Sequence, residues 1–402
     1  MTSPRWPEIN GPLSPYAPGF GAELEHQGYK PLSLLHQIRL LGDLSRWLDE
    51  QGLAADALTP KAAERYLADR PSAGHTTHLT ARALTPVLTY LRGHAAIAPA
   101  PVPAPHGAAE ELLWRYRDYL ERERGLVPMS ARGYVDKLRP FVEGVFGPEG
   151  PGLANLTAAE VGAYLAERAA TQGRRATQLT ATALRSLLGY LYLEGEIDSP
   201  LADAVPAAAS PRLAGLPKAL EPAEVRALLE SCDPAAPCGR RDLAILTILW
   251  RLGLRAGEVA SLGLDDLDFR AGELVVRGKG RSERLPLPTD VGEALVSYLR
   301  DGRPATAQGR SVFVRVKAPH RGLTAGAVGY VVRAAAHRAG LEGIHAHRLR
   351  HTAASELLRA GASLPEVGRV LGHRRLATTA IYAKLDREAL REIARPWPEE
   401  LR

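Results

Sequence analysis

Two proline- and alanine-rich stretches divide the chain into three pieces, and this division limits the folds open to it. The stretches run over residues 98–106 and 199–217. Both lack apolar periodicity and are stiffened by proline, which is typical of linkers between domains. The chain has 402 residues, 45% of them apolar, so each piece is long enough to bury a core of its own. We therefore expect three domains, at residues 1–105, 106–212 and 213–402.

The first two pieces are helical by pattern and carry no strand signal. Apolar residues recur at helical spacing from Leu34 to Leu48 in the first piece, and Leu112, Tyr116 and Leu120 do so in the second. We expect both pieces to fold as helical domains.

The same two pieces also resemble each other. LTPKAAERYLADR at residues 58–70 parallels LTAAEVGAYLAER at residues 156–168, and the segment from residue 78 to 97 parallels the segment from 178 to 197. Ala- and Leu-rich helices can converge on similar sequences, but matching turns and tyrosines favour an internal duplication. We expect the first piece to fold independently and to contact DNA or a neighbouring protomer. Its candidate phosphate-facing residues are Lys61, Arg65, Arg82 and Arg92, with His75 and His78 as weaker candidates.

The third piece mixes helices with a hairpin. The segment GELVVRGKGRSERLPLP alternates apolar residues on both sides of GKGR, which predicts a β-hairpin. The overall prediction is a mainly α, multidomain chain whose last domain is α+β with a small hairpin or sheet. The helices predicted in the third piece cover residues 222–231, 240–252, 290–300, 324–339, 347–360, 364–371 and 377–384.

The distribution of charged residues along the chain, more than the net charge, indicates a polyanionic partner. The net charge of +6 and the pI near 9.3 reflect 51 basic against 45 acidic residues, a mild excess. Between His345 and Arg375, however, there are six arginines and only two acids, Glu356 and Glu366. We expect phosphate to bind in this region.

Several classes of protein are disfavoured by what the sequence contains. No run approaches eighteen consecutive apolar residues, and residues 1–10 do not form an apolar signal core, so we expect a cytoplasmic protein without a membrane span. Cys232 and Cys238 stand alone, without a second pair or a nearby histidine. A disulfide framework or a zinc knuckle is therefore not expected.

Arg255 lies between two apolar helical stretches and follows Gly253, which is placed to end a helix. An arginine near a core has to be paired, because burying an unpaired guanidinium is costly. Its partner is either Glu258, three residues later, or an incoming phosphate. This stretch by itself favours the salt bridge, with Glu258 as a buried acid that orients the motif.

The segment HRLRH opens a helix in which His347, Arg350 and His351 share one face by their spacing, while Leu349 and Ala353 turn inward. A solvated basic face and a metal site are the alternatives. No carboxylate or further histidine at helical spacing completes a metal set, so we expect none.

His373 precedes Tyr382 by nine residues in GHRRLATTAIYAKLD. A tyrosine at the end of an apolar stretch is usually a core residue with a hydrogen-bonded hydroxyl, and that interpretation prevails for Tyr382 considered singly.

The ordered set of these residues changes the interpretation, because it resembles the tyrosine recombinases, also called phage integrases, in their Xer-like branch. The similarity spans roughly residues 217–393: GLRAGEVASL is similar to the family's first-arginine motif, GKG to its lysine motif, HRLRHTAASELLRAG to its His-x-x-Arg motif and LGHRRLATTAIYAKL to its motif with the third histidine and the nucleophile. The second piece resembles the family's DNA core-binding domain by position and helical pattern. The catalytic residues that the resemblance implies are Arg255, Lys279, His347, Arg350, His373 and Tyr382.

The resemblance implies a site-specific recombinase that cleaves and rejoins DNA through a 3′-phosphotyrosine intermediate, without metal, cofactor or ATP. Arg255 and Arg350 can each present a planar fork to phosphate oxygens and so replace a metal cation. Tyr382, with an ordinary pKa near 10, needs activation before it can attack, and His347 is the leading base.

The remaining roles follow from the same resemblance. Lys279, on a hairpin tip flanked by glycines, is expected to give a proton to the 5′-hydroxyl leaving group, and His373 to position a phosphate oxygen. His351 is assigned to the structural surroundings. The expected partners are double-stranded DNA and further copies of this chain, as a tetramer on DNA, with partner recombinases left open.

Three alternatives remain. Xer-type resolution of chromosome dimers uses the same chemistry, although the long N-terminal region favours an integrase or transposon recombinase. A type IB topoisomerase uses a similar residue set, but the linear motifs here are Xer-like. A non-catalytic DNA-binding regulator is disfavoured, because no catalytic position is substituted.

Overall fold

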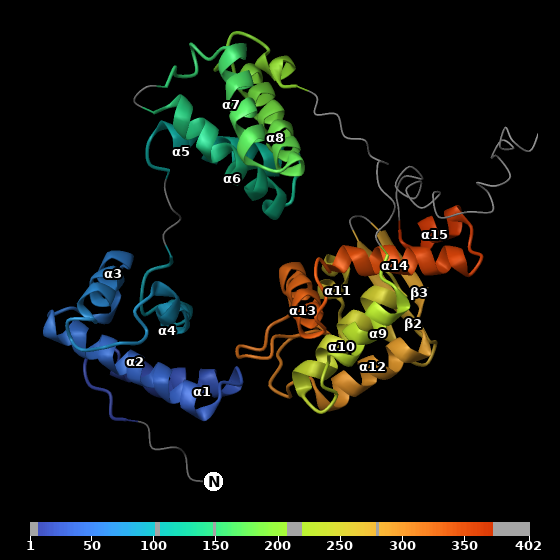
Figure 1. The fold of residues 1–402 in the computed structure, drawn as a ribbon. Coiled ribbons are helices and arrows are strands. Elements are labelled where there is room, and N and C mark those ends of the chain that lie inside the picture. Colours follow the sequence, from blue (N-terminus) through green and yellow to red (C-terminus); the bar gives the residue numbers. More distant parts are fainter. Residues whose placement is uncertain (1–6, 101–104, 148–149, 207–218, 279–280, 373–402) are drawn as a thin grey trace, which may run out of the picture. The chain divides into compact units, whose positions relative to one another are not determined.

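The structure, a computed structural model, describes residues 7–100, 105–147, 150–206, 219–278 and 281–372. Three large hydrophobic clusters lie within these residues, one in each third of the chain (Figure 1). None of the helices in the described ranges is both long and apolar enough to cross a membrane.

The N-terminal segment is a helical module with its own core. Proline starts α2 and α3, since it lacks the N–H group that a helix's first residue leaves unpaired. Thr59 caps α3 by accepting a hydrogen bond from the amide of Ala62 at 3.2 Å. The apolar face of α2 packs on α1, α3 and α4 around buried leucines. The elements are η1 (Ser14–Tyr16), α1 (Ala17–His26), α2 (Pro31–Glu50), η2 (Ala55–Ala57), α3 (Pro60–Asp69) and α4 (Ala81–Gly93).

The second segment is also helical. Thr157 begins α7 with a capping box in which its side chain and that of Glu160 bond reciprocally to the backbone. Its core gathers leucines of α8 against Tyr116 of α5 and Phe141 of α6. The elements are α5 (Ala108–Arg122), α6 (Pro128–Val145), α7 (Ala158–Thr171), α8 (Arg174–Leu193) and η3 (Leu201–Ala204).

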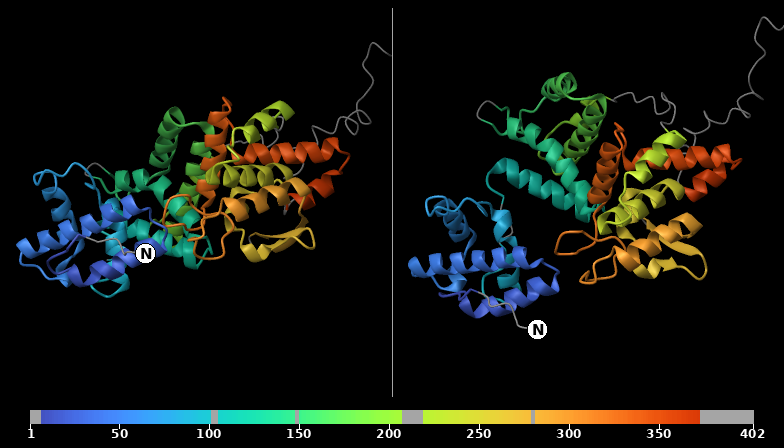
Figure 2. Two further views of the ribbon diagram at one scale, coloured as in Figure 1. Left: turned by 90° about the horizontal axis from the view of Figure 1, so that it is seen from below. Right: turned by 60° about the horizontal axis from the view of Figure 1, so that its bottom comes forward.

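The C-terminal segment is built around α10, an apolar helix whose buried residues contact helices on several sides (Figure 2). A three-stranded antiparallel sheet in the order β1-β2-β3 packs on the same core through Leu274, Val276 and Leu285. Its elements are α9 (Pro222–Glu230), α10 (Pro237–Arg251), α11 (Ala256–Ser261), η4 (Leu264–Asp266), β1 (Leu267–Asp268), β2 (Glu273–Gly278), β3 (Arg281–Pro286), α12 (Thr289–Asp301), α13 (Ala325–Arg338), α14 (Ala346–Arg359) and α15 (Leu364–Val370).

The predicted fold class is confirmed, including the hairpin, whose strands pair from Glu273 with Pro286 to Gly278 with Arg281. Strand β1, of two residues, and η4, of three, were not predicted, because neither is long enough to show a period. The helix predicted over residues 377–384 lies outside the described residues.

Candidate functional site

The turn after α10 places the first arginine of the site. Gly253 has a φ of +60°, a conformation that L side chains rarely adopt. A Cβ at this position would also lie 2.6 Å from Leu371 Cδ2 and 3.2 Å from Ala353 Cβ. Glycine is therefore required here both by the turn and by the close packing of α14 and the end of α15. Leu252 and Leu254 are buried on either side of it, and Arg255 follows as the N-cap of α11.

Arg255 forms the predicted salt bridge. Its Nη1 lies 2.6 Å from Glu258 Oε1, and its backbone amide donates to Glu258 Oε2 at 2.8 Å. The Glu258 side chain is 8% exposed, which confirms the buried acid, whereas the Arg255 side chain is 46% exposed. The carboxylate thus holds one edge of the guanidinium, while the side chain stays accessible from solvent. Its contact with phosphate stays a prediction.

Arg350 is the buried member of the set that helical spacing places on one face of α14. Its side chain is only 2% exposed, whereas His347 is exposed. The long side chain of Arg350 reaches two backbone carbonyls: Nη1 donates to Gly253 O at 2.5 Å, and Nη2 donates to Leu371 O. A guanidinium buried in this way satisfies both acceptors and is held in one orientation.

These bonds bring three segments together. Arg350 on α14 contacts the turn that carries Arg255 and the end of α15, and the link from α10 to α14 is reinforced by Trp250, whose indole N–H donates to Glu356 at 2.9–3.0 Å. Sequence reasoning missed both the carbonyl anchors and the Trp250–Glu356 link. The only signal was Gly253, identified as a helix end.

The two histidines of α14 are neighbours. The ring centroids of His347 and His351 are 4.8 Å apart, in an edge-on arrangement. Burial lowers the pKa of His351 to about 4, assisted by the nearby positive charges of His347 and Arg350. His351 is therefore neutral at pH 7. His345, not singled out before, caps α14 by accepting from the amide of Arg348 at 3.3 Å.

The hairpin is anchored close to its turn. Asp266 is buried and accepts from Arg277 Nε at 2.9 Å and from the amide of Gly263 at 2.9 Å. This bond fixes the end of β2 next to Gly278. Three predicted site residues, Lys279, His373 and Tyr382, lie outside the described residues. Within the described ranges, no group of three or more His, Cys, Asp or Glu side chains could hold a metal ion.

The sequence matches the phage integrase family over residues 218–389 and the phage integrase N-terminal SAM-like domain over residues 113–195. A protein of Sinorhizobium fredii named as integrase/recombinase y4rA is 40% identical over 398 residues, which covers 97% of this chain and 96% of that protein. The chain belongs to the phage integrase family. It is an enzyme of the tyrosine-type site-specific recombinase class, as the ordered motifs predicted.

Other members of this family are similar over shorter lengths. The tyrosine recombinase XerC of Oceanobacillus iheyensis is 32% identical over 285 residues, covering 68% of this chain and 92% of that protein. Among solved structures, XerH recombinase in a post-cleavage complex with its difH substrate is 23% identical, with a TM-score of 0.56 over 70% of this chain and 83% of that one. A lambda integrase dimer bound to a COC′ core site is 20% identical, with a TM-score of 0.54 over 71% and 96%. At these identities, the solved structures indicate a shared fold.

Proposed function

We propose that this recombinase cleaves and rejoins double-stranded DNA through a 3′-phosphotyrosine bond to Tyr382, without metal, cofactor or ATP. The observation that carries the proposal is the anchoring of Arg350 to the carbonyls of Gly253 and Leu371. It joins the segments of three motifs, those of Arg255, Arg350 and the region that leads to His373 and Tyr382, around one buried guanidinium. Such a site is organised before DNA arrives, as stabilisation of a developing charge requires.

The two arginines neutralise the phosphate in this proposal. Each guanidinium offers five N–H donors in a rigid fork, and each is oriented by protein acceptors: Arg255 by Glu258, Arg350 by two carbonyls. Charge that builds on the non-bridging oxygens then meets cations that are already in place. This arrangement supports a metal-free reaction.

The proton transfers are assigned to three further residues. His347, exposed on the first turn of α14, takes the proton of the Tyr382 hydroxyl as the tyrosine oxygen attacks phosphorus. Lys279, which follows the last residue of β2, donates a proton to the departing 5′-oxygen. His373 hydrogen-bonds a phosphate oxygen. The new tyrosyl phosphodiester keeps the energy of the broken bond, so a 5′-hydroxyl of a second DNA end can reverse the attack.

The partners proposed are duplex DNA and further copies of this chain. A solved lambda integrase, 18% identical with a TM-score of 0.53, is a tetramer bound to a Holliday junction, and XerH is bound to difH DNA. These relatives support a tetramer on DNA, with partner recombinases left open. The proposed domains are an N-terminal module at residues 1–105, a core-binding domain at 106–212 and a catalytic domain at 213–402.

The biological role proposed is that of an integrase or transposon recombinase. XerC and XerD relatives cover 68–74% of this chain although nearly all of their own length is matched, so about a quarter or more of this chain has no counterpart in them. The relative named integrase/recombinase matches almost throughout. This difference in coverage favours mobility of a DNA element over resolution of chromosome dimers.

The test is covalent trapping on DNA. Duplexes that the chain binds tightly are selected from a random library and nicked near the inferred cleavage position, so that the short 5′-hydroxyl strand diffuses away after attack. The expected product is a protein–DNA adduct that withstands denaturation. Relaxation of supercoiled plasmid without any adduct specific to one sequence would instead indicate a topoisomerase.

A further inference from the structure

The N-terminal module and the core-binding domain share one helical framework. Gly28 and Gly125 both have positive φ, +82° and +61°, and three residues after each a proline starts the long helix, α2 or α6. At the same spacing, each of the six residues that α6 buries corresponds to a residue that α2 buries. The matched pairs are Leu34 with Ala131, Ile38 with Val135, Leu41 with Leu138, Leu44 with Phe141, Ser45 with Val142 and Leu48 with Val145.

The second halves agree in finer detail. Arg70 lies over the ring of Tyr66 at 5.3 Å, and at the equivalent place Arg168 lies over Tyr164 at 5.0 Å. Helices α4 and α8 end with the same 2.9 Å bond, which joins Leu91 O to the amide of Ala96 and Leu191 O to the amide of Glu196. The residue before that amide has positive φ in both copies: +53° at Ala95, although it is not glycine, and +70° at Gly195. The geometry supports the internal duplication.

The two copies also leave the same apolar positions exposed. Within residues 7–100, the large apolar side chains exposed to solvent are Leu32, at 65%, and Leu79, at 39%. Leu32 follows the proline that starts α2, and its counterpart, Met129 on α6, is exposed as well. Leu79, just before α4, corresponds to Leu179 in α8, which is also exposed. Apolar side chains exposed at matched places in two copies indicate a retained contact surface.

Two stretches of the N-terminal module contain no acidic residue. Residues 26–42, which include the first half of α2, contain no acid, and neither do residues 70–100, which include α4. The counterpart of the second stretch starts at residue 168; it is free of acids as far as residue 193 and then carries Glu194, Glu196 and Asp198. The rings of His36 and His78 are 6.1 Å apart, so the start of α2 and the segment before α4 lie side by side.

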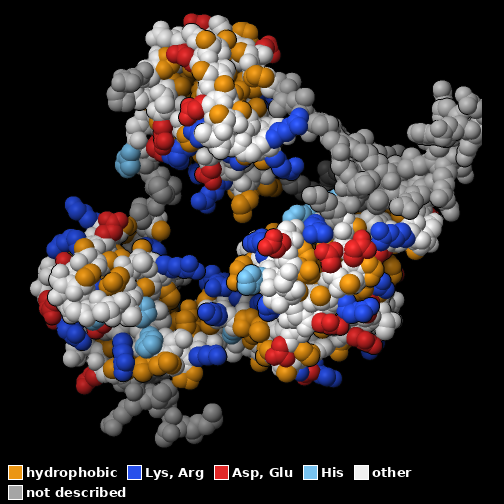
Figure 3. Space-filling view, in the orientation of Figure 1, with side chains coloured by type: hydrophobic (Ala, Val, Ile, Leu, Met, Phe, Trp, Pro, Cys, Tyr) orange, Lys and Arg blue, Asp and Glu red, His pale blue; other side chains and the backbone are white. Residues whose placement is uncertain are grey.

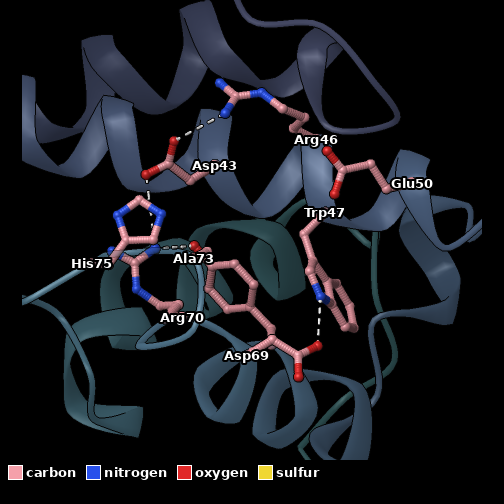
Figure 4. Close-up of a pocket in the computed structure, with 9 residues that line it drawn as sticks. Asp43, Arg46, Trp47, Glu50, Asp69, Arg70, Ala73 and His75 are labelled. Atoms are coloured by element: carbon pink, nitrogen blue, oxygen red, sulfur yellow. Dashed lines mark hydrogen bonds and ion pairs between the residues drawn. The ribbon is translucent and has the colours of Figure 1, made fainter.

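Histidine side chains lie together on the surface of this module, and Lys and Arg side chains lie at several places around it (Figure 3). The acids lie elsewhere in this module. Asp43, Glu50 and Asp69 line a pocket between α2 and α3 (Figure 4), where Asp69 accepts from the indole of Trp47 at 3.0 Å.

We propose that the N-terminal module is a second core-binding unit, which binds duplex DNA through this α2–α4 face. The face is defined by Lys30, Leu32, His36, Arg39, Leu79 and Arg82, which are all exposed. Lys30, Arg39 and Arg82 supply phosphate contacts, the positive ends of α2 and α4 add to the field, and Leu32 and Leu79 contact base edges or sugars. This inference rests on the proposed function, since it adds a second DNA contact to a DNA-cleaving enzyme.

The structure separates the basic residues expected from sequence. Arg82 belongs to the α2–α4 face. Lys61 and Arg65 lie on α3 together with Glu64 and Asp69, and Arg65 lies over the ring of Trp47 at 5.8 Å. The pair on α3 therefore provides a matched control: the same module, the same change of charge and exposed side chains, but a different surface.

The experiment measures the salt dependence of binding of the full chain to a long duplex of mixed sequence. Each phosphate contact contributes about 0.9 to the slope of log affinity against log salt, so Arg39→Glu with Arg82→Glu should reduce the slope by about 2. Lys61→Glu with Arg65→Glu should leave it unchanged. The neutral pair Arg39→Ala with Arg82→Ala replaces the charge reversals if thermal unfolding shows that they disturb the fold, and should also flatten the slope by about 2.

Two results overturn the inference. An unchanged slope in the α2–α4 variant would assign this face to a protein contact, and an equal loss in the α3 variant would mean that general charge, not a face, is responsible. The proposed function is tested separately, because both variants should still form the Tyr382 adduct on a suicide duplex. A wild-type chain that does not bind the duplex contradicts both proposals.

Discussion

Replacing Arg350 by alanine should damage the fold and the chemistry together. The side chain is almost wholly buried, and its removal leaves the carbonyls of Gly253 and Leu371 without their donor. A buried acceptor left unsatisfied costs about 1–3 kcal/mol, so two of them should lower the free energy of local opening around α14 by about 2–6 kcal/mol. Cleavage should also fall by about 10²-fold or more, the scale expected when a preorganised donor to a developing charge is lost.

Arg255→Ala is the matched comparison. Its side chain is about half exposed and its ion pair is with a single carboxylate, which also keeps a bond from the backbone amide. Because the Glu258 carboxylate is buried, losing this donor should cost about 1–3 kcal/mol around α11, and cleavage should fall about as far as in Arg350→Ala while α14 stays nearly unaffected. Arg→Lys should rescue poorly at both positions, because lysine lacks the planar fork.

Hydrogen exchange measured by mass spectrometry separates the two effects, because it reports the opening free energy of α14 apart from the other domains. We expect faster exchange in α14 for Arg350→Ala and near wild-type exchange for Arg255→Ala, with cleavage measured on the same suicide duplex. Unchanged protection of α14 in Arg350→Ala would refute the anchoring role. If a variant of either arginine cleaves DNA at the wild-type rate, that arginine has a structural role and no catalytic one.

Three further outcomes follow from the site. Gly253→Ala should destabilise the catalytic domain by about 1–2 kcal/mol for the left-handed backbone and about 1–3 kcal/mol more for overpacking against Leu371, measured by urea unfolding; an unchanged midpoint would contradict the close packing. Between pH 6.5 and 4, His351 binds a proton in the unfolded chain but not in the folded one, so stability should fall as pH drops through this range, and His351→Gln should weaken that dependence; equal slopes would oppose a lowered pKa. Cleavage should persist in EDTA, because arginines and Lys279 supply the positive charge; activity lost on chelation and restored by magnesium would contradict the metal-free mechanism.

The sequence predicted those parts of the site that side-chain patterns mark. The hairpin was found because apolar residues alternate on both sides of a glycine-flanked turn. The pairing of Arg255 with Glu258 was found because an arginine close to a core needs an acid within reach. The burial of Arg350 could not be found in this way. Its acceptors are backbone carbonyls that lie 97 and 21 residues away in the sequence. Every residue has a backbone carbonyl, so the pattern of side chains does not indicate which ones accept a hydrogen bond.

The duplication was visible only in part for a related reason. The two copies share identical residues around Tyr66 and Tyr164, where an arginine side chain lies over the tyrosine ring in both. Helices α2 and α6 hold equivalent positions with different residues, as in Leu44 and Phe141, because a core preserves volume and burial more strictly than residue identity.

The central claim is that Tyr382 becomes covalently joined to DNA, and one measurement tests it most directly. The chain is incubated with a suicide duplex and digested with protease and nuclease, and the peptides are sequenced by mass spectrometry. We predict a nucleotide attached through a 3′-phosphate to the peptide that contains Tyr382, and no adduct from Tyr382→Phe, whose DNA affinity should stay close to that of the wild type because only one hydroxyl is removed. An adduct on another residue, or one that persists in Tyr382→Phe, would contradict the account.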